Sequence, residues 1–301
     1  MPGPAQDDSA DRALASEQYF VRALGGFVLG IAGADLVTHE KIPLPRFNFV
    51  QVREVAPGRR TAFVERALDH YFQRALRPTF RIPDPVPSHL DTTVRALGFV
   101  PRPDRLALLV PGPRPEERSG PYSVRPARTD ELDRILPLWT GDSDRPELRT
   151  ALDIAWHHPN PDERLTPYVA LRDDRIASGG LRYEYRGAAG LHFVATAPAE
   201  RGRGAASALV AGVFGGHRGA GGPPYGFLFA DSPRLEARLR ALGFEVVRTF
   251  TVYELPRSAS LALPPVGPEG PPRWRPPRGG GGSTPNRGAE AGAISRPGGR
   301  P

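Results

Sequence analysis

The most informative segment of this sequence is a glycine-rich turn, which reads Ala197-Pro198-Ala199-Glu200-Arg201-Gly202-Arg203-Gly204-Ala205-Ala206. An apolar run over residues 191–197 precedes it and a helical pattern over 205–214 follows it, which predicts the order strand, turn, helix. Gly202 and Gly204 remove Cβ atoms where a backbone must bend tightly. The free N–H groups of the following helix point back into the turn, so it can hold a phosphate, and Arg201 and Arg203 add positive charge.

Two common phosphate-binding motifs do not fit this turn. A Walker P-loop needs a lysine after its last glycine, and the only lysine of the chain is Lys41. The dinucleotide fingerprint Gly-x-Gly-x-x-Gly needs glycine at the position of Ser207. On the turn alone, a tight strand-to-helix connection without a ligand stays open as the alternative.

The pattern Arg201-x-x-Gly204-x-Ala206, with Pro198 ahead of it, resembles the pyrophosphate-binding motif of the GNAT superfamily, the GCN5-related N-acetyltransferases. Patterns over residues 122–256 give the order β-α-α-β-β-β-α-β-α-β, which is similar to the whole GNAT fold. Leu-Gly-Phe at 242–244, a common end of the last helix in this family, is a second match. The resemblance implies an α/β (α+β) fold with a mixed sheet, the acyl-CoA N-acyltransferase fold.

A second feature is an internal repeat. Arg-Ala-Leu-Gly-Phe occurs at 95–99 and again at 240–244. Each copy follows a strand-like run and a helix with a serine near its start, Ser88 or Ser232, which can cap the helix. We therefore expect two tandem GNAT-like domains. Residues 58–62 of the first copy lack the paired glycines, so this copy is predicted to be degenerate, without cofactor binding, and to serve in packing, in dimerisation as a possible homodimer, or in shaping the substrate cleft.

Composition sets the predicted domain boundaries. Residues 1–15 are polar and carry no core pattern, so we expect a disordered N-terminus without a signal peptide. The degenerate domain is expected over 16–112, a proline-rich linker over 113–121, and the acetyltransferase domain over 122–256. Residues 257–301 are rich in proline, glycine and arginine and are predicted to be a disordered tail.

Charge and residue types limit the partners. The chain has a net charge of +7, but the tail, with seven arginines and two glutamates, carries +5 of it. A folded part near +2 gives no support for nucleic-acid binding. The chain has no cysteine, which excludes thiolate sites and agrees with a cytoplasmic location. The seven histidines show no metal-ligand spacing, and no apolar run is long enough for a membrane span, so neither a metal nor a membrane is expected.

The GNAT resemblance implies acetyl-CoA as the acyl donor and a primary amine, of a small molecule or a protein, as the acceptor. The amine would attack the thioester directly in a ternary complex. Main-chain groups of Val194, Ala195 and Thr196 would bind the pantetheine arm. The turn and the first helical residues would hold the pyrophosphate: Arg201, Gly202, Arg203, Gly204, Ala205, Ala206 and Ser207.

The sequence departs from the family at the catalytic positions. Many relatives place a tyrosine five residues before the phenylalanine of Leu-Gly-Phe, to protonate the thiolate, and this position is Leu239. The catalytic residues are therefore unknown, and Glu184 and His192, on predicted strands beside the cleft, are the candidates for proton transfer. The alternative function is a catalytically inactive acyl-CoA-binding sensor or structural module.

Overall fold

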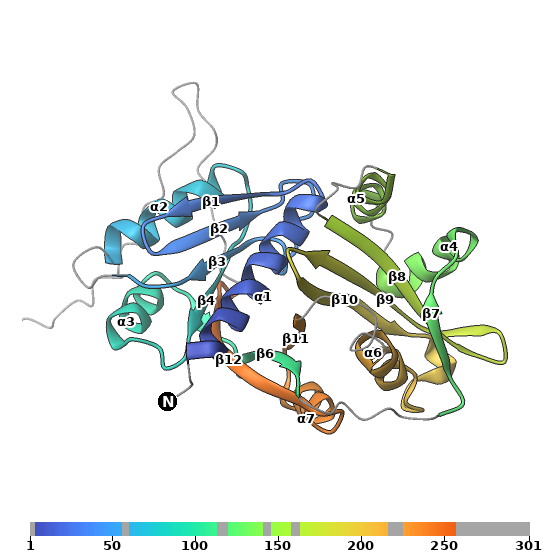
Figure 1. The fold of residues 1–301 in the computed structure, drawn as a ribbon. Helices are drawn as coiled ribbons and strands as arrows, with labels where there is room; N and C mark the ends of the chain where they lie inside the picture. The colour runs from blue at the N-terminus through green and yellow to red at the C-terminus, as the bar shows by residue number, and fades with distance from the viewer. Residues whose placement is uncertain are drawn as a thin grey trace, which may run out of the picture.

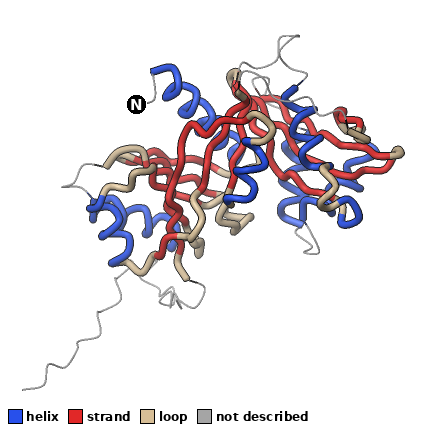
Figure 2. Tube along the Cα trace, turned by 90° about the horizontal axis from the view of Figure 1, so that it is seen from below, coloured by secondary structure: helices blue, strands red, loops and turns tan. Residues whose placement is uncertain are grey.

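The computed structural model describes residues 4–55, 60–112, 120–140, 146–157, 163–215 and 225–256. The predicted tail 257–301 and most of the predicted linker 113–121 lie outside these residues. The described residues contain twelve strands that form a single mixed sheet (Figure 1). The strands continue without a break from one half of the chain to the other, with helices on both sides (Figure 2).

The first half begins with a helix where disorder was expected. The expectation for residues 1–15 is wrong over the described part, because α1 spans Pro4–Ala23 and buries Ala10, Ala13 and Leu14. The hydrophobic effect orders this segment through contacts with distant strands, which composition does not reveal. The other elements of this half are β1 (Phe27–Ile31), β2 (Ala34–Thr38), β3 (Phe49–Val52), α2 (Arg60–Phe72), β4 (Thr79–Pro83), α3 (Ser88–Ala96), β5 (Val100–Pro101) and β6 (Leu106–Pro111).

The second half has the element order expected of the acyltransferase fold. It contains β7 (Ser123–Pro126), a short 3₁₀ turn η2 (Thr129–Glu131), α4 (Leu132–Thr140), α5 (Pro146–His157), β8 (Glu163–Arg172), β9 (Arg175–Tyr185), β10 (Ala188–Thr196), a 3₁₀ turn η3 (Pro198–Glu200), α6 (Ala205–Gly215), β11 (Tyr225–Ala230), α7 (Pro233–Arg240) and β12 (Phe244–Glu254).

The strand order shows that the two halves exchange their last strands. The order is β1-β2-β3-β4-β12-β6-β11-β10-β9-β8-β7, with β5 beside β12. Strand β12, from the end of the second half, pairs antiparallel with β4 of the first half. Strand β6, from the end of the first half, pairs antiparallel with β11 of the second half. Each half therefore completes the sheet of the other.

The predicted repeat is visible in the structure. In each half two parallel strands, β3 with β4 and β10 with β11, are followed by a short helix that ends at a glycine with positive φ, +87° at Gly98 and +82° at Gly243. These glycines are required by the left-handed backbone that ends the helix. The predicted serine cap holds only for Ser232, whose Oγ accepts the N–H of Leu235. Ser88 is already the first helical residue, and Pro87 precedes it without a side-chain cap.

Helix α1 joins the halves across one face of the sheet. It contacts β1 and β2 of the first half as well as β9, β10 and β11 of the second (Figure 1). Its residues Phe20 and Val21 share one hydrophobic cluster with Leu181 and Phe193 of the second half. Helix α6 covers the opposite face, where Leu209 and Val213 pack on strands from both halves. Burial of these faces fixes the two halves against each other.

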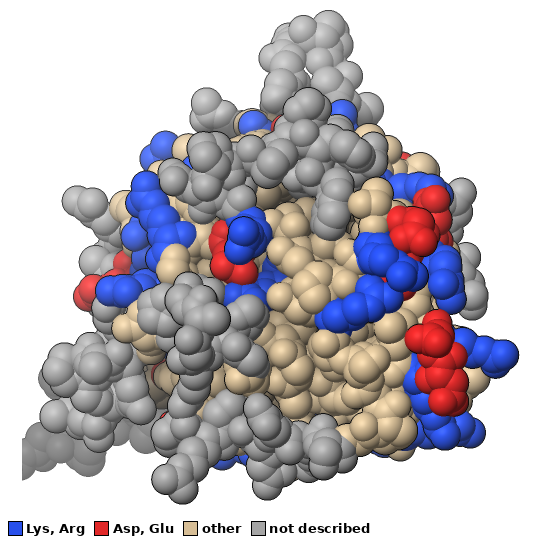
Figure 3. All heavy atoms as spheres, turned by 45° about the vertical axis from the view of Figure 1, so that its right-hand side comes forward, with Lys and Arg blue, Asp and Glu red and all other residues tan. Residues whose placement is uncertain are grey.

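Charges on the surface are mixed in sign. On the face shown in Figure 3, the acidic side chains lie next to basic ones around a broad area of uncharged residues. Many arginines are in ion pairs of this kind, such as Arg95 with Asp91 and Arg240 with Glu236. The charged residues that are visible on this face (Figure 3) lie in separate groups, which contain acidic as well as basic side chains.

Candidate functional site

Strands β10 and β11 run side by side at first and then separate. Only residues 188–190 of β10 pair with β11, at 225–227. The rest of β11 turns to β6 instead, through Leu228, Phe229 and Ala230. The far half of β10 is thereby left with an edge that no strand covers, and its main-chain N–H and C=O groups can hydrogen-bond to a ligand.

A bulge in β10 shapes this open edge. The register with β9 shifts between His192 and Ala195, and Phe193 has a positive φ of 54°. Ser178 on β9 fixes the far side of the bulge, because its Oγ donates to the carbonyl oxygen of Ala195 at 2.7 Å. The side chain of Val194 is exposed as a result, although it is apolar. A bulge of this kind re-aims side chains next to a binding site.

The glycine turn lies directly beyond the open edge. Gly202 and Gly204 have φ values of +78° and +92°, a backbone that side chains other than glycine rarely adopt. No atom lies within 4 Å of a Cβ placed at either position, so the space above the turn is open. The N–H of Ala208 donates to the carbonyl of Gly204 at 2.9 Å. The N–H groups before it have no acceptor within the helix and point into this space.

An interaction that the sequence did not reveal holds the turn in place. Glu200 accepts a hydrogen bond from the hydroxyl of Tyr122 at 2.8 Å and contacts Arg172 at 3.5 Å. The Tyr122 bond and the charges of Arg172 and Arg203 lower the pKa of Glu200. The carboxylate therefore stays ionised and ties the turn to β7 and β8.

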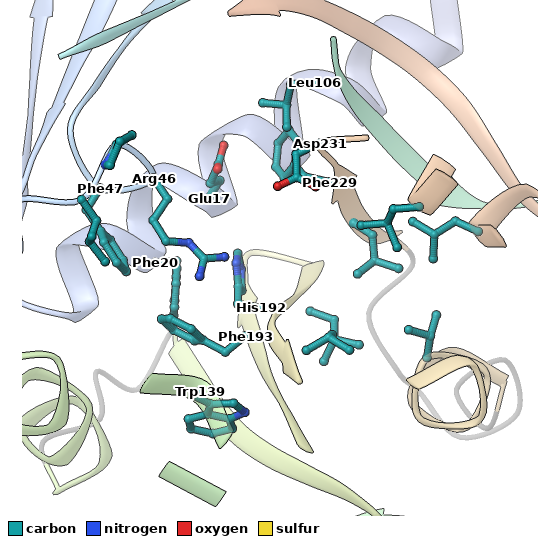
Figure 4. A pocket seen from close by; sticks show the side chains of 18 of the residues that line it. Glu17, Phe20, Arg46, Phe47, Leu106, Trp139, His192, Phe193, Phe229 and Asp231 are labelled. Carbon is teal, nitrogen blue, oxygen red and sulfur yellow. The ribbon is translucent and has the colours of Figure 1, made fainter. Parts of the chain in front are cut away.

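A cavity of about 710 Å³ opens from the turn toward the first half of the chain (Figure 4). Ala206, Ser207 and Val194 line the end at the turn, together with Leu239 of α7. The other end lies against the first half and is mainly aromatic, with Phe20 of α1 and Phe47 as well as Trp139 and Phe193 of the second half. The volume is typical of small-molecule sites.

Six charged side chains line this cavity: Glu17, Arg46, Arg81, Arg102, Asp231 and Arg238. Arg102 is paired with Glu254, and Arg238 has no ion-pair partner among the described residues. Glu17 and Arg81 form a buried ion pair, in which one guanidinium nitrogen contacts both carboxylate oxygens at 2.9 Å. Arg46 and Asp231 have no ion-pair partner among the described residues. Arg46 lies over the ring of Phe193, with its guanidinium carbon 4.7 Å from the ring centroid.

Comparisons with known proteins agree with this geometry. Residues 130–221 match the model of the acetyltransferase (GNAT) family. These residues therefore carry a GNAT acetyltransferase domain. A search of the curated proteins found no match.

Solved structures are similar to most of the chain. A GCN5-related N-acetyltransferase from Kribbella flavida has a TM-score of 0.60 at 14% identity, over 81% of this chain and 95% of that one. A tandem GNAT protein from the clavulanic acid biosynthesis pathway has a TM-score of 0.53 at 15% identity, over 75% and 79%. A GCN5-related N-acetyltransferase from Sphaerobacter thermophilus has a TM-score of 0.52 at 19% identity, over 84% and 93%. The resemblance therefore extends to the fold of both halves.

Within this GNAT fold, the residues predicted to bind acetyl-CoA occupy two adjoining segments. Val194, Ala195 and Thr196 form the open edge of β10, and residues 201–207 form the turn and the start of α6. The side chains of Arg201 and Arg203 are exposed, and Arg203 lies 3.8 Å from Glu200. The GNAT pattern thus places backbone N–H groups at the centre of the turn and arginine side chains at its rim.

The two candidates for proton transfer lie on opposite faces of the sheet. Glu184 faces α6 and is held by Arg182 at 2.8 Å, outside the residues that line the cavity. His192 lines the cavity, and its ring is stacked on that of Phe20 at 3.9 Å. Burial and, to a lesser degree, the charge of Arg46 lower the pKa of His192 to about 3, and its buried Nε2 has no hydrogen-bond partner. With this pKa, the imidazole of His192 is uncharged at neutral pH and carries no second proton that it could donate.

The cavity also contains residues that sequence analysis missed. Leu239 lines it at the position where many GNAT relatives carry a tyrosine, so this wall offers no hydroxyl. Glu17 and Phe20 come from α1, whose buried residues Ala10, Ala13, Leu14 and Val21 recur at the spacing of a helix face. This spacing is the sequence signal from which helix α1 could have been predicted. No sequence signal pointed to Arg46, which follows β2 in an irregular segment.

The first half has no comparable opening between its parallel strands. Strand β3 has four residues, and three of them, Phe49, Val50 and Gln51, pair with β4. The turn that follows, at 56–59, lies outside the described residues. No group of three or more potential metal ligands occurs among the residues that the structure describes. In the same residues, no helix combines the length and apolar character of a membrane span.

Proposed function

We propose that this protein is an N-acetyltransferase that transfers the acetyl group of acetyl-CoA to a primary amine. The main support is the continuous path from the glycine turn, along the open edge of β10, into a cavity with unpaired charges. The two segments fit the donor, because the turn offers N–H groups to a diphosphate and the strand edge offers main-chain groups to an amide-containing arm. Acetyl-CoA supplies an activated acyl group when bound.

The chain's own residues would position the reactants. Open N–H groups of β10 beside the bulge can stabilise negative charge that develops on a thioester oxygen. In the transfer a C–N bond forms, the C–S bond breaks, the amine loses a proton and the thiolate gains one. Asp231 is the unpaired carboxylate of the cavity and can face the ammonium of the acceptor. With Leu239 in place of a tyrosine, we infer that the thiolate takes its proton from solvent.

We further propose that the two GNAT-like domains, expected over residues 16–112 and 122–256, have their last strands exchanged, that the first begins earlier, with α1 at residue 4, and that only the second binds acetyl-CoA. The first domain would shape the acceptor site, to which it contributes Phe20, Arg46 and Phe47. A catalytically inactive acyl-CoA-binding module is the second candidate. Leu239 and the lowered pKa of His192 favour it, since leucine has no proton to donate and a histidine with a low pKa is a weak base.

Calorimetry with acetyl-CoA tests both candidates at once. We expect one site per chain, and absence of binding would contradict both functions. A thiol-release assay over a panel of amines then separates them, because only the enzyme releases CoA in proportion to the amine consumed. Acetyl-CoA binding without release by any small or protein amine would favour the inactive module.

A further inference from the structure

The acceptor end of the cavity is lined by a positively charged side chain, that of Arg46. Arg46 points from the first half of the chain toward His192 and the space between the halves (Figure 4). Neighbouring protein groups partly desolvate Arg46 and lower its pKa, and the charge of Glu17 opposes this shift. The side chain of Arg46 is nonetheless exposed, so its guanidinium can meet an anion that enters the cavity.

No ion pair with a described residue occupies Arg46. The charge of Glu17 raises the pKa of Arg46, but the carboxylate of Glu17 is engaged by Arg81, which contacts both of its oxygens. Asp231 raises the pKa of Arg46 through its charge but forms no ion pair with it. Among the described residues, the contacts of Arg46 are the rings of Phe47 and Phe193. Such stacking holds the guanidinium plane and leaves its edge N–H donors available.

The surroundings of Arg46 are apolar and of limited size. Phe20, Phe47, Phe193 and Trp139 form the walls, and the cavity of about 710 Å³ must also hold the end of the acyl donor. Walls from both halves line this end. The space therefore suits a small acceptor with an apolar side chain better than a protein surface.

From these observations, and on the basis of the proposed function, we propose that the acceptor is a small amino acid with an apolar side chain, whose carboxylate is bound by Arg46. A carboxylate matches the planar donor fork of a guanidinium, which can bind both of its oxygens. Asp231, a carboxylate of the cavity without an ion-pair partner among the described residues, would face the ammonium. The cavity thus presents Arg46 to the carboxylate and Asp231 to the ammonium of a zwitterion.

The test compares amino acids with the amines that remain when their carboxylate is removed. The probes are phenylalanine with phenethylamine, tyrosine with tyramine, and leucine with isoamylamine. In the wild type, the acid of a pair should have a kcat/KM about 10- to 100-fold higher than its amine, the range expected for a charged hydrogen bond. Arg46→Gln should remove this preference by lowering kcat/KM for the acid alone, and Arg46→Lys should restore part of it.

Two further variants make the result specific. Asp231→Asn should lower kcat/KM for both members of a pair, because both carry the ammonium. Arg105→Gln removes a surface guanidinium that is paired with Glu236, and it should leave the preference intact. Equal turnover of acid and amine, a preference that survives Arg46→Gln, or activity on protein amines only would overturn the proposal.

Binding gives a readout that does not depend on turnover. The CoA-saturated protein is titrated with N-acetylphenylalanine and with N-acetylphenethylamine in a calorimeter. The acid should bind at least about tenfold more tightly, and Arg46→Gln should remove the difference. If CoA binds but neither acid nor amine binds in an Arg46-dependent way, the acceptor proposal fails while the acetyl-CoA site stands. If acetyl-CoA and CoA themselves do not bind, the proposed function fails.

Discussion

At the scale of single residues, His192 shows how the cavity controls charge. Its ring is stacked on Phe20, its Nε2 is buried without a partner, and its pKa is lowered to about 3. The unfolded chain binds a proton at this residue near pH 6.5, whereas the folded chain does not. Below about pH 6.5, His192 is therefore protonated in the unfolded chain but stays unprotonated in the folded chain.

This difference predicts that acid destabilises the fold. Between about pH 6.5 and pH 3 the unfolded state binds more protons, so the free energy of unfolding falls as the pH falls, by about 1.4 kcal/mol per pH unit for one such histidine. Urea unfolding at several pH values measures the slope. His192→Phe should reduce the slope in this range. His70, whose pKa is lowered to about 4, should keep its own contribution in the variant. An unchanged slope would show that His192 is protonated in the folded protein.

At the scale of elements, the glycine turn and the repeated helix ends allow a matched comparison. Gly204 and Gly98 have nearly the same φ, +92° and +87°, and nothing lies within 4 Å of a Cβ at either position. Substitution of either glycine therefore strains the backbone to a similar degree and causes no clash. They differ only in what they face, since Gly204 precedes α6 at the proposed phosphate site.

We predict that Gly204→Ala and Gly98→Ala each cost about 1–2 kcal/mol of stability. Only Gly204→Ala should weaken acetyl-CoA binding, because only there does the methyl group enter the space above the turn. Gly204→Glu should abolish binding by adding a carboxylate. Thermal unfolding measures the first effect and calorimetry the second. Equal affinity in both alanine variants would remove the turn from the binding site.

Many features of the secondary-structure elements could be predicted from the local sequence. Glycines at 202, 204, 98 and 243 lie where the backbone is left-handed, as expected for a tight turn and for helix ends. The cofactor residues were proposed from the turn motif and the strand before it. Helix α1 was missed, because its partners are distant strands and its own sequence is polar on average. Arg46 was missed because only the meeting of the two halves makes it part of a cavity.

At the scale of the whole molecule, the exchange of β6 and β12 is the main departure from two separate domains. Residues 122–256 alone would leave β11 without β6 and would place β12 beside an absent β4. The acceptor end of the cavity would also lose Phe20, Arg46 and Phe47. The expectation of an independent acetyltransferase domain therefore needs a direct experiment.

A protease site inserted in the linker 113–119 provides this experiment. After cleavage the two fragments should elute together in gel filtration and retain acetyl-CoA binding, because two exchanged strands and α1 hold them. Separation should require denaturant. An uncleaved protein with the same insertion serves as the control for the insertion itself. Fragments that separate under native conditions would contradict a shared sheet.

The position of β12 also has a consequence for synthesis. Residues 244–254 leave the ribosome after almost all other described residues, yet they cover the edge of β4, which is made among the first hundred. During most of translation the first half of the chain therefore presents an unpaired strand edge, the type of surface that promotes aggregation. The edge of β4 therefore stays uncovered in the emerging polypeptide until β12 has been synthesised.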